Sequence, residues 1–277
     1  MIVTPDGTEY FVFDGHTHLG GRPYQTSVVS PQHYLEEQLL EDMDASGVDM
    51  AVVFPRGNPH TNYYDENDYV VQAATRHPSR LVPYVRINPY YRSQCVEHIQ
   101  EFAARGARGL KFHPFKDTGG TPVNQPELMH PLMEEARTLG LVVLIHSGEA
   151  WNSSPALIGD LASHFPDVTF IIAHAGLWEF HQEAIATAKR LPNVYVDTAE
   201  VAPPRVVTNC VRGIGQDRVI YGSDRPAIAF GFEIGKVLKY ADLTSEEAAL
   251  VLGGNLLRVL GLSPDLARYQ RQPLSAL

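Results

Sequence analysis

Short apolar runs alternate with amphipathic stretches along most of the chain. Residues 50–54 (Met-Ala-Val-Val-Phe) are apolar at every position, as in a parallel strand that is covered on both faces. The stretches between such runs repeat apolar residues at helical spacing. The pattern therefore predicts strands and helices in regular alternation.

Eight strands are predicted in this way, at residues 10–13 with its extension to 18, 50–54, 81–88, 109–113, 141–146, 168–174, 194–197 and 219–224. Helices are predicted at residues 31–46, 65–76, 92–105, 126–139, 155–165, 178–191, 204–212, 232–240 and 244–260. A polar loop is expected at residues 20–30, another loop from Pro114 to Thr121, and a partly ordered tail after Pro264. A short hairpin around Pro5-Asp6-Gly7 precedes the first long strand.

Eight strand–helix units predict a closed (β/α)₈ TIM barrel, in the α/β class. We expect one domain over residues 1–277, with a barrel core at about 10–262. The alternative is an open doubly wound sheet, which usually carries a glycine-rich nucleotide turn after its first strand. Gly20-Gly21 does not fit that turn, so the barrel is favoured.

Titratable residues gather at the carboxyl ends of these strands, where barrel enzymes carry their chemistry. They are His16, His18, Lys111, His113, His146, His174, Asp197 and Asp224. The stability of the fold does not require titratable residues at these positions. The strands thus predict a catalytic site at one mouth of the barrel.

Side-chain alternation predicts which of these residues face the barrel axis. His16 and His18 would share a face with Asp14, about 6.5–7 Å apart along the strand. His174 would share a face with Ile172. The predicted inward set is His16, His18, Lys111, His113, His146, His174 and Asp224.

This inward set has the composition of a metal site. Imidazole suits zinc, iron, nickel or copper, and three or four protein ligands leave an open position for water. Water bound to zinc can reach a pKa of about 7. A single His-x-His pair is weak evidence for a metal site. The evidence is strengthened here because other strands also end in potential metal ligands.

The charge and composition of the chain disfavour a nucleic-acid partner, a membrane span and secretion. The formal charge is −10 and the pI about 5.6, which disfavours binding to nucleic acid. No apolar run is long enough to cross a membrane, and no secretory signal is visible. The two cysteines lie far apart, as expected for reduced thiols. We expect a cytoplasmic protein with a small-molecule substrate.

Several motifs together resemble the amidohydrolase superfamily. They are His16-Thr17-His18 after the first strand, His146 and His174 ending the fifth and sixth, Gly222-Ser223-Asp224-Arg225-Pro226 after the eighth, and the closing residues 252–262. Their order is similar to the branch with aminocarboxymuconate-semialdehyde decarboxylase, resorcylate decarboxylases and pyrone-dicarboxylate lactonase. The resemblance covers residues 10 to 262, and suggests a homodimer.

The resemblance implies roles for the strand-end residues. His16, His18, His146 and Asp224 match the ligands of one divalent metal ion, Zn²⁺ first and Mn²⁺ as the alternative. Asp224 would also take the proton from water, and His174 would act as acid or base. Metal use varies in this branch, and the lactonase needs none.

The resemblance also places Lys111 where binuclear members carry a carboxylated lysine. Its context, Lys111-Phe112-His113-Pro114, is instead typical of the mononuclear branch. A free ammonium, paired with a substrate carboxylate or with Asp14, is therefore favoured over a carboxylated lysine bridging two metals.

Four further residues are candidates for substrate binding. Arg56 and Arg225 could bind a carboxylate through two hydrogen bonds, or form salt bridges at the barrel rim. His113 could contact substrate or bond across the barrel. Trp151 could wall the pocket or simply pack.

These observations favour a metal-dependent hydrolase of a small, carboxylated lactone, ester or cyclic amide. The alternative is a metal-dependent, non-oxidative decarboxylase of an aromatic or enoic acid. A third hypothesis is a non-catalytic barrel that binds a ligand. Changing Asp224 to Asn would separate it from the enzymes, since ligand binding could survive the change and hydrolysis could not.

Overall fold

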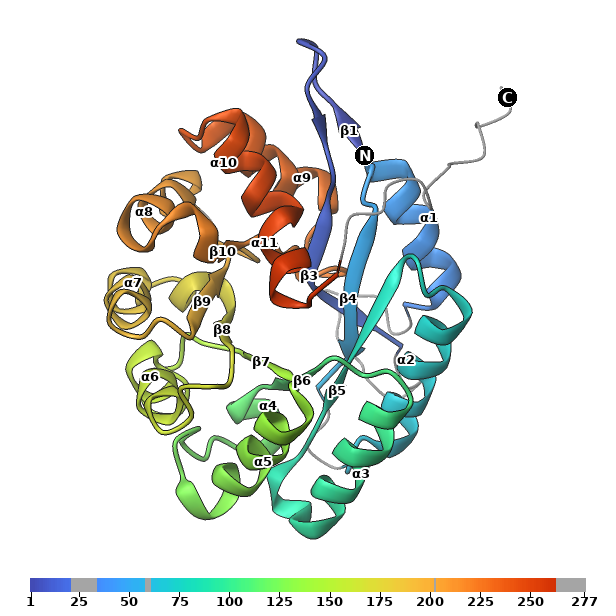
Figure 1. Cartoon of the computed structure of the whole chain (residues 1–277), viewed down its shortest axis with the longest axis vertical. Coiled ribbons are helices and arrows are strands. Elements are labelled where there is room, and N and C mark those ends of the chain that lie inside the picture. The colour runs from blue at the N-terminus through green and yellow to red at the C-terminus, as the bar shows by residue number, and fades with distance from the viewer. Residues whose placement is uncertain (21–33, 58–60, 202, 263–277) are drawn as a thin grey trace.

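The computed structural model describes residues 1–20, 34–57, 61–201 and 203–262 (Figure 1). Its strands form one parallel eight-stranded sheet in the order β10-β9-β8-β7-β6-β5-β4-β3, which confirms the barrel. The strands are β3 (Phe13–Leu19), β4 (Met50–Pro55), β5 (Leu81–Arg86), β6 (Gly109–Phe112), β7 (Val142–Ile145), β8 (Phe170–Ile172), β9 (Val194–Asp197) and β10 (Val219–Ile220). The predicted hairpin is present as β1 (Ile2–Val3) and β2 (Glu9–Tyr10).

Isolated backbone hydrogen bonds between β3 and the residues that follow β10 close the barrel. Gly15 donates to the Tyr221 carbonyl at 2.9 Å, Asp224 to the His16 carbonyl at 2.8 Å, and His18 to the Arg225 carbonyl at 2.8 Å. A Cβ atom on Gly15 would lie 2.8 Å from Ile220 Cγ2. Glycine at this position therefore lets the two ends of the sheet meet.

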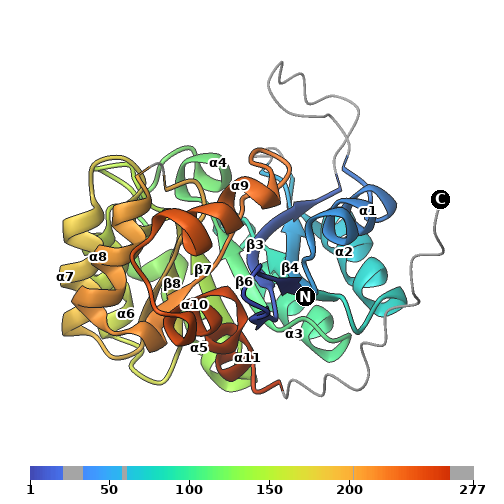
Figure 2. The same ribbon diagram turned by 90° about the horizontal axis from the view of Figure 1, so that it is seen from above.

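Helices encircle the strands in Figures 1 and 2. They are α1 (Glu36–Ser46), α2 (Tyr64–Arg76), α3 (Ser93–Ala104), α4 (Pro114–Thr118), α5 (Pro126–Leu139), α6 (Pro155–Ser163), α7 (His181–Arg190), α8 (Pro204–Ile214), α9 (Phe230–Gly235), α10 (Ser245–Ala249) and α11 (Asn255–Val259). No helix in these described ranges is long and apolar enough to cross a membrane.

Several predicted boundaries were wrong. Residues 114–121 are not all loop, because Pro114 opens the short helix α4; five residues give no periodic signal. The seventh helix begins at His181 rather than Trp178. The predicted helix 244–260 is interrupted by the π-helical turn η5 (Leu250–Gly254). The predicted element ends within residues 21–33 and after residue 262 lie outside the described residues.

Two apolar clusters separate the inside of the barrel from its outside. The smaller one joins strand residues such as Val52, Leu144 and Ile171 to Leu256, Leu257 and Leu260 near the chain end. The larger one joins the opposite strand faces to the surrounding helices. Because the smaller cluster contains only strands and the α11 region, α11 covers the end of the barrel opposite the carboxyl ends of the strands.

Candidate active site

His16 and His18 reach the barrel interior through a bulge rather than through plain alternation. The register of β3 against β4 shifts between Asp14, which pairs with Ala51, and Thr17, which pairs with Val53. Ala51 and Val53 belong to the outer cluster. Asp14 therefore does not share the inner face with the two histidines, and that part of the alternation prediction was wrong.

Three donor atoms converge at the mouth. Asp224 Oδ1 lies 3.1 Å from His18 Nε2 and 3.3 Å from His16 Nε2. Donor atoms about 2.0–2.1 Å from a tetrahedral metal ion lie roughly 3.3–3.4 Å from one another. The spacing of these three atoms therefore fits one small cation.

The hydrogen bonds of the two rings fix their tautomers. Nδ1 of His16 lies 2.8 Å from Asp197 Oδ2, and Nδ1 of His18 lies 3.2 Å from the Pro55 carbonyl oxygen. Both partners are acceptors, so each Nδ1 carries the proton. Each Nε2 lone pair then faces Asp224, an arrangement that a bound cation stabilises.

The protonation of these groups favours cation binding as well. Burial would raise the pKa of Asp224, but the neighbouring imidazoles of His16 and His18 hold that pKa well below its usual range. Burial lowers the pKa of His18 to about 3. Asp224 is thus a carboxylate, and His18 a neutral ligand, at neutral pH.

Asp197 has a larger role than the sequence indicated. One carboxylate oxygen accepts from His16 Nδ1, and the other accepts from the backbone N–H groups of His174 (2.7 Å) and Ala199 (3.1 Å). The side chain is fully buried. Asp197 therefore orients His16 and ties β9 to the turn that follows β8.

His174 also reaches the mouth by a break in alternation. Phe170 and Ile172 lie in the outer cluster, so the predicted shared face of His174 and Ile172 was wrong. The chain instead enters a 3₁₀ turn, η2 (Ala173–Gly176), where His174 has φ 59°. This left-handed conformation, unusual for a residue with a side chain, brings the ring 4.8 Å from that of His16.

His146 lies beside His174 rather than within the group of three donor atoms. His146 Nδ1 is 2.9 Å from His174 Nε2, and its Nε2 is 3.1 Å from Glu149 Oε1. Since the Ala199 carbonyl accepts from His174 Nδ1 at 3.1 Å, His146 is the donor to His174. Its role as fourth metal ligand stays a prediction.

Lys111 and His113 face the interior from β6 and the residue that follows it. Lys111 Nζ lies 3.1 Å from His16 Nε2, and burial lowers the pKa of Lys111 to about 7. Asp14 instead accepts from the backbone N–H groups of His16 and Ser223, so it is not the partner of Lys111. The His113 ring stacks on His146 with 3.6 Å between centroids.

The other predicted substrate residues lie at different places on the rim. Trp151 is 57% exposed and contacts Phe115 edge to face. Arg56 is half-buried, and burial lowers its pKa although Asp224 opposes the change. Arg225 forms an ion pair with Asp42 on α1, which is the rim salt bridge that the sequence left open.

Arg86 was missed, although it is fully buried at the end of β5. Its Nε donates to Asp117 Oδ1 at 2.8 Å and its Nη1 to the Pro55 carbonyl at 3.2 Å. It pairs in register with Lys111. The sequence did carry a signal for Arg86, because this charged residue ends an otherwise apolar strand. Lys111 was found by the same kind of signal.

The sequence matches the family model described as amidohydrolase over residues 13–262. The chain belongs to the amidohydrolase family. A comparison of this amidohydrolase with curated proteins finds no match.

Solved structures with the same fold include two kinds of enzyme. A 5-carboxyvanillate decarboxylase from Novosphingobium aromaticivorans, complexed with manganese and 4-hydroxy-3-methoxy-5-nitrobenzoic acid, is 15% identical (91% of this chain, 96% of that chain, TM-score 0.73). A 2,6-dihydroxybenzoate decarboxylase from Rhizobium is 13% identical (91% and 99%, TM-score 0.74). A probable 2-pyrone-4,6-dicarboxylic acid hydrolase from Acinetobacter baumannii, with citric acid bound, is 15% identical (91% and 99%, TM-score 0.69).

These neighbours share the fold of this chain, and they include a decarboxylase and a hydrolase of the kinds named in the branch that the sequence motifs resemble. The amidohydrolase is an enzyme of this superfamily, and at these identities the neighbours establish its fold. Both a hydrolase and decarboxylases occur among them, so the reaction has to be argued from the site.

Proposed function

We propose that this amidohydrolase hydrolyses a small carboxylated lactone, ester or cyclic amide with the help of one divalent metal ion. The observation that carries the proposal is the approach of His16 Nε2 and His18 Nε2 to Asp224 Oδ1, at 3.3 and 3.1 Å, at the mouth. His146 would complete the set. Zn²⁺ suits two imidazoles and a carboxylate, and Mn²⁺, present in one structural neighbour, is the alternative.

A bound cation would lower the pKa of water and polarise a carbonyl oxygen. Asp224 is ionised, and its second carboxylate oxygen would be the acceptor for the proton that the water loses. His174 holds its Nδ1 proton on the Ala199 carbonyl and its Nε2 on His146. This pair of imidazoles can pass a proton to the leaving group.

Decarboxylation is the second candidate, and the cations at the mouth favour it. Lys111 lies inside the barrel beside His16, where an ammonium can hold a carboxylate next to the metal position. His174 or Asp224 would then protonate carbon after CO₂ leaves. The structural neighbours include a 5-carboxyvanillate decarboxylase and a 2,6-dihydroxybenzoate decarboxylase.

Metal content and product analysis test both candidates. Wild type should hold about one Zn²⁺ or Mn²⁺ per chain by elemental analysis, and His16→Ala with Asp224→Asn should lose it. The matched control, His164→Ala with Asp167→Asn, changes the same residue types at exposed positions and should keep the metal. An unmetallated wild type that still turns over substrate would overturn the proposed mechanism.

Isotope labelling then separates the two reactions. In H₂¹⁸O, hydrolysis of a carboxylated lactone places one ¹⁸O in the product carboxylate, whereas decarboxylation of a hydroxybenzoate releases CO₂ and takes a proton from solvent. Label in the product with no CO₂ release supports the hydrolase. Stoichiometric CO₂ release without label would replace it by the decarboxylase.

A further inference from the structure

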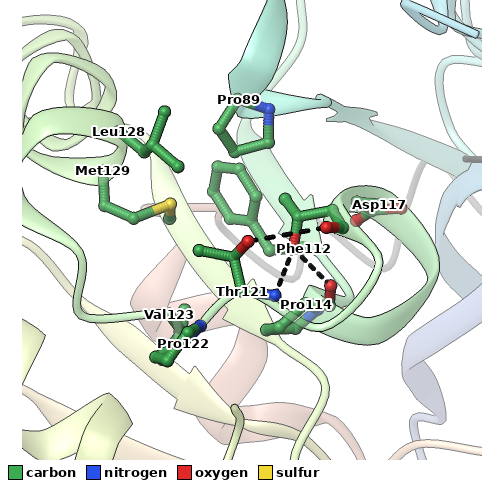
Figure 3. Close-up of a pocket in the computed structure, with 10 residues that line it drawn as sticks. Pro89, Phe112, Pro114, Asp117, Thr121, Pro122, Val123, Leu128 and Met129 are labelled. Carbon is green, nitrogen blue, oxygen red and sulfur yellow. Dashed lines mark hydrogen bonds between the residues drawn. The ribbon is translucent and has the colours of Figure 1, made fainter.

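The short helix α4 is held firmly at the mouth of the barrel. Asp117 accepts hydrogen bonds from the His113 backbone N–H (2.6 Å), the Tyr63 hydroxyl (2.7 Å) and Arg86 Nε (2.8 Å). At the end of the helix, the Thr118 hydroxyl donates to the Pro114 carbonyl and accepts from the Thr121 N–H (Figure 3). The side chain of Lys116 therefore starts from a fixed backbone.

The stem of Lys116 lies over the loop that follows β4. A Cβ atom on Gly57 would lie 2.8 Å from Lys116 Cδ, 3.0 Å from Lys116 Cβ and 2.7 Å from Arg86 Nη2. Only glycine leaves this space, because any larger residue would push the two cationic side chains apart. Lys116 and Arg86 thus approach each other directly beside Arg56.

Both of the converging cations keep unused hydrogen-bond donors. Among the described residues, the Lys116 ammonium has no ion pair or hydrogen bond, and the buried Arg86 Nη2 has no partner. Desolvation lowers the pKa of Lys116, the charge of Arg86 lowers it further, and Asp224 opposes the change.

The stem of Lys116 lies against Gly57 beside Arg86, and its side chain is exposed, so its ammonium is open to a ligand. The chain as a whole has a net charge of −10, so this positive region is local. A divalent cation bound to His16, His18 and Asp224 would make it more positive still. An anion in the mouth would offset these charges.

We propose that Lys116 and Arg56, with Arg86 behind them, form a subsite for a second carboxylate, which makes the substrate a dicarboxylate. Lys116 is its specificity-determining residue. The inference rests on the proposed function, in which the scissile end of the substrate faces Asp224. It adds the requirement that the opposite end carry a negative charge.

The test uses binding of unreactive probes, so that it does not depend on turnover. The metal-loaded protein is titrated calorimetrically with benzoate and with the 1,2-, 1,3- and 1,4-benzenedicarboxylates. Wild type should bind at least one dicarboxylate ten times or more tighter than benzoate. Lys116→Gln should abolish that preference and leave benzoate affinity unchanged, whereas Lys116→Arg should keep most of it.

Lys189→Gln provides the matched control, because Lys189 is an exposed lysine in the last turn of α7. It should bind all four probes like wild type. Absence of any dicarboxylate preference in wild type would overturn the subsite, as would a Lys116→Gln variant that keeps the preference or weakens benzoate equally. Failure of the hydrolase proposal would appear instead as probe binding without hydrolysis of any lactone, ester or amide.

Discussion

The chemistry of His16 depends on a single neighbouring carboxylate. Asp197 accepts the Nδ1 proton of His16 and so leaves the Nε2 lone pair for a metal. In Asp197→Asn, an amide nitrogen facing His16 would offer a second donor to Nδ1, and the ring would favour the other tautomer. We expect a loss of metal affinity of about 10–100-fold, measured by competition with a chelator.

The same change should leave the fold nearly intact, because the amide oxygen can still accept from the His174 and Ala199 N–H groups. A circular-dichroism melt that stays close to wild type, with weaker metal binding, is the expected pair of results. Unchanged metal affinity would show that Asp197 does not position His16.

A second residue-scale effect concerns a buried glutamate–lysine pair away from the predicted metal ligands. Glu233 and Lys236 are paired and almost fully buried, and burial raises the pKa of Glu233 to about 8. Between its unfolded pKa and this value, the folded state binds more protons than the unfolded state. Stability from this group is therefore lost as pH rises towards 8.

One proton bound only in the folded state corresponds to about 1.4 kcal/mol per pH unit. From pH 5 to pH 7, the free energy of unfolding of wild type should fall relative to Glu233→Gln by up to about 2–3 kcal/mol. Urea titrations of both proteins at several pH values measure the difference. Parallel pH profiles would contradict the raised pKa.

At the scale of elements, the irregular stretch of β3 around Gly15 both lets the barrel close and directs His16 and His18 to its interior. A methyl group on Gly15 would meet Ile220 Cγ2 at 2.8 Å and the Tyr221 carbonyl at 3.1 Å, so β3 and β10 would have to separate. Overpacking of this kind costs about 1–3 kcal/mol. We expect Gly15→Ala to lose that stability and to bind metal more weakly, since Asp224 follows β10.

Gly231→Ala is the control for this prediction. Gly231 lies in helix α9 with no atom within 4 Å of its ideal Cβ, so alanine there should be neutral or slightly stabilising. Thermal melts and chelator competition on both variants give the comparison. A Gly15→Ala variant as stable as Gly231→Ala would show that the ends of the sheet can separate at no cost.

At the scale of the whole molecule, the end of the barrel opposite the active site is covered by α11. Leu256 is buried against the inner strand residues. Leu256→Ala should lower the free energy of unfolding by about 2–5 kcal/mol through the cavity it leaves, and Leu256→Met by less than about 1.5 kcal/mol. Denaturant titration gives both values.

Because active site and cover lie at opposite ends, metal-loaded Leu256→Ala should keep the metal affinity of wild type below its melting temperature. Stability would then depend on the end of the barrel that α11 covers, and metal binding on the opposite end. A large loss of metal affinity would mean that the cover at one end controls geometry at the other.

Much of the architecture could be predicted from the sequence, because covered parallel strands are apolar throughout and alternate with amphipathic helices. The strand ends with His16, His18, Lys111, His174 and Asp224 do meet at one mouth. Alternation failed at Asp14 and His174, where a bulge and a left-handed residue reverse the direction of a side chain. Periodicity assumes regular backbone, and functional sites often depart from it.

The sequence alone determined the number of strand–helix units, the end of the barrel that carries chemistry, and the residue types available there, since each follows from local composition and order. Tertiary structure alone decided which of those residues touch. Asp197 orients His16, Arg86 braces the helix that carries Lys116, and Arg225 turns to Asp42. These contacts join residues 31 to 183 positions apart, and closure of the barrel, not local sequence, sets their distances.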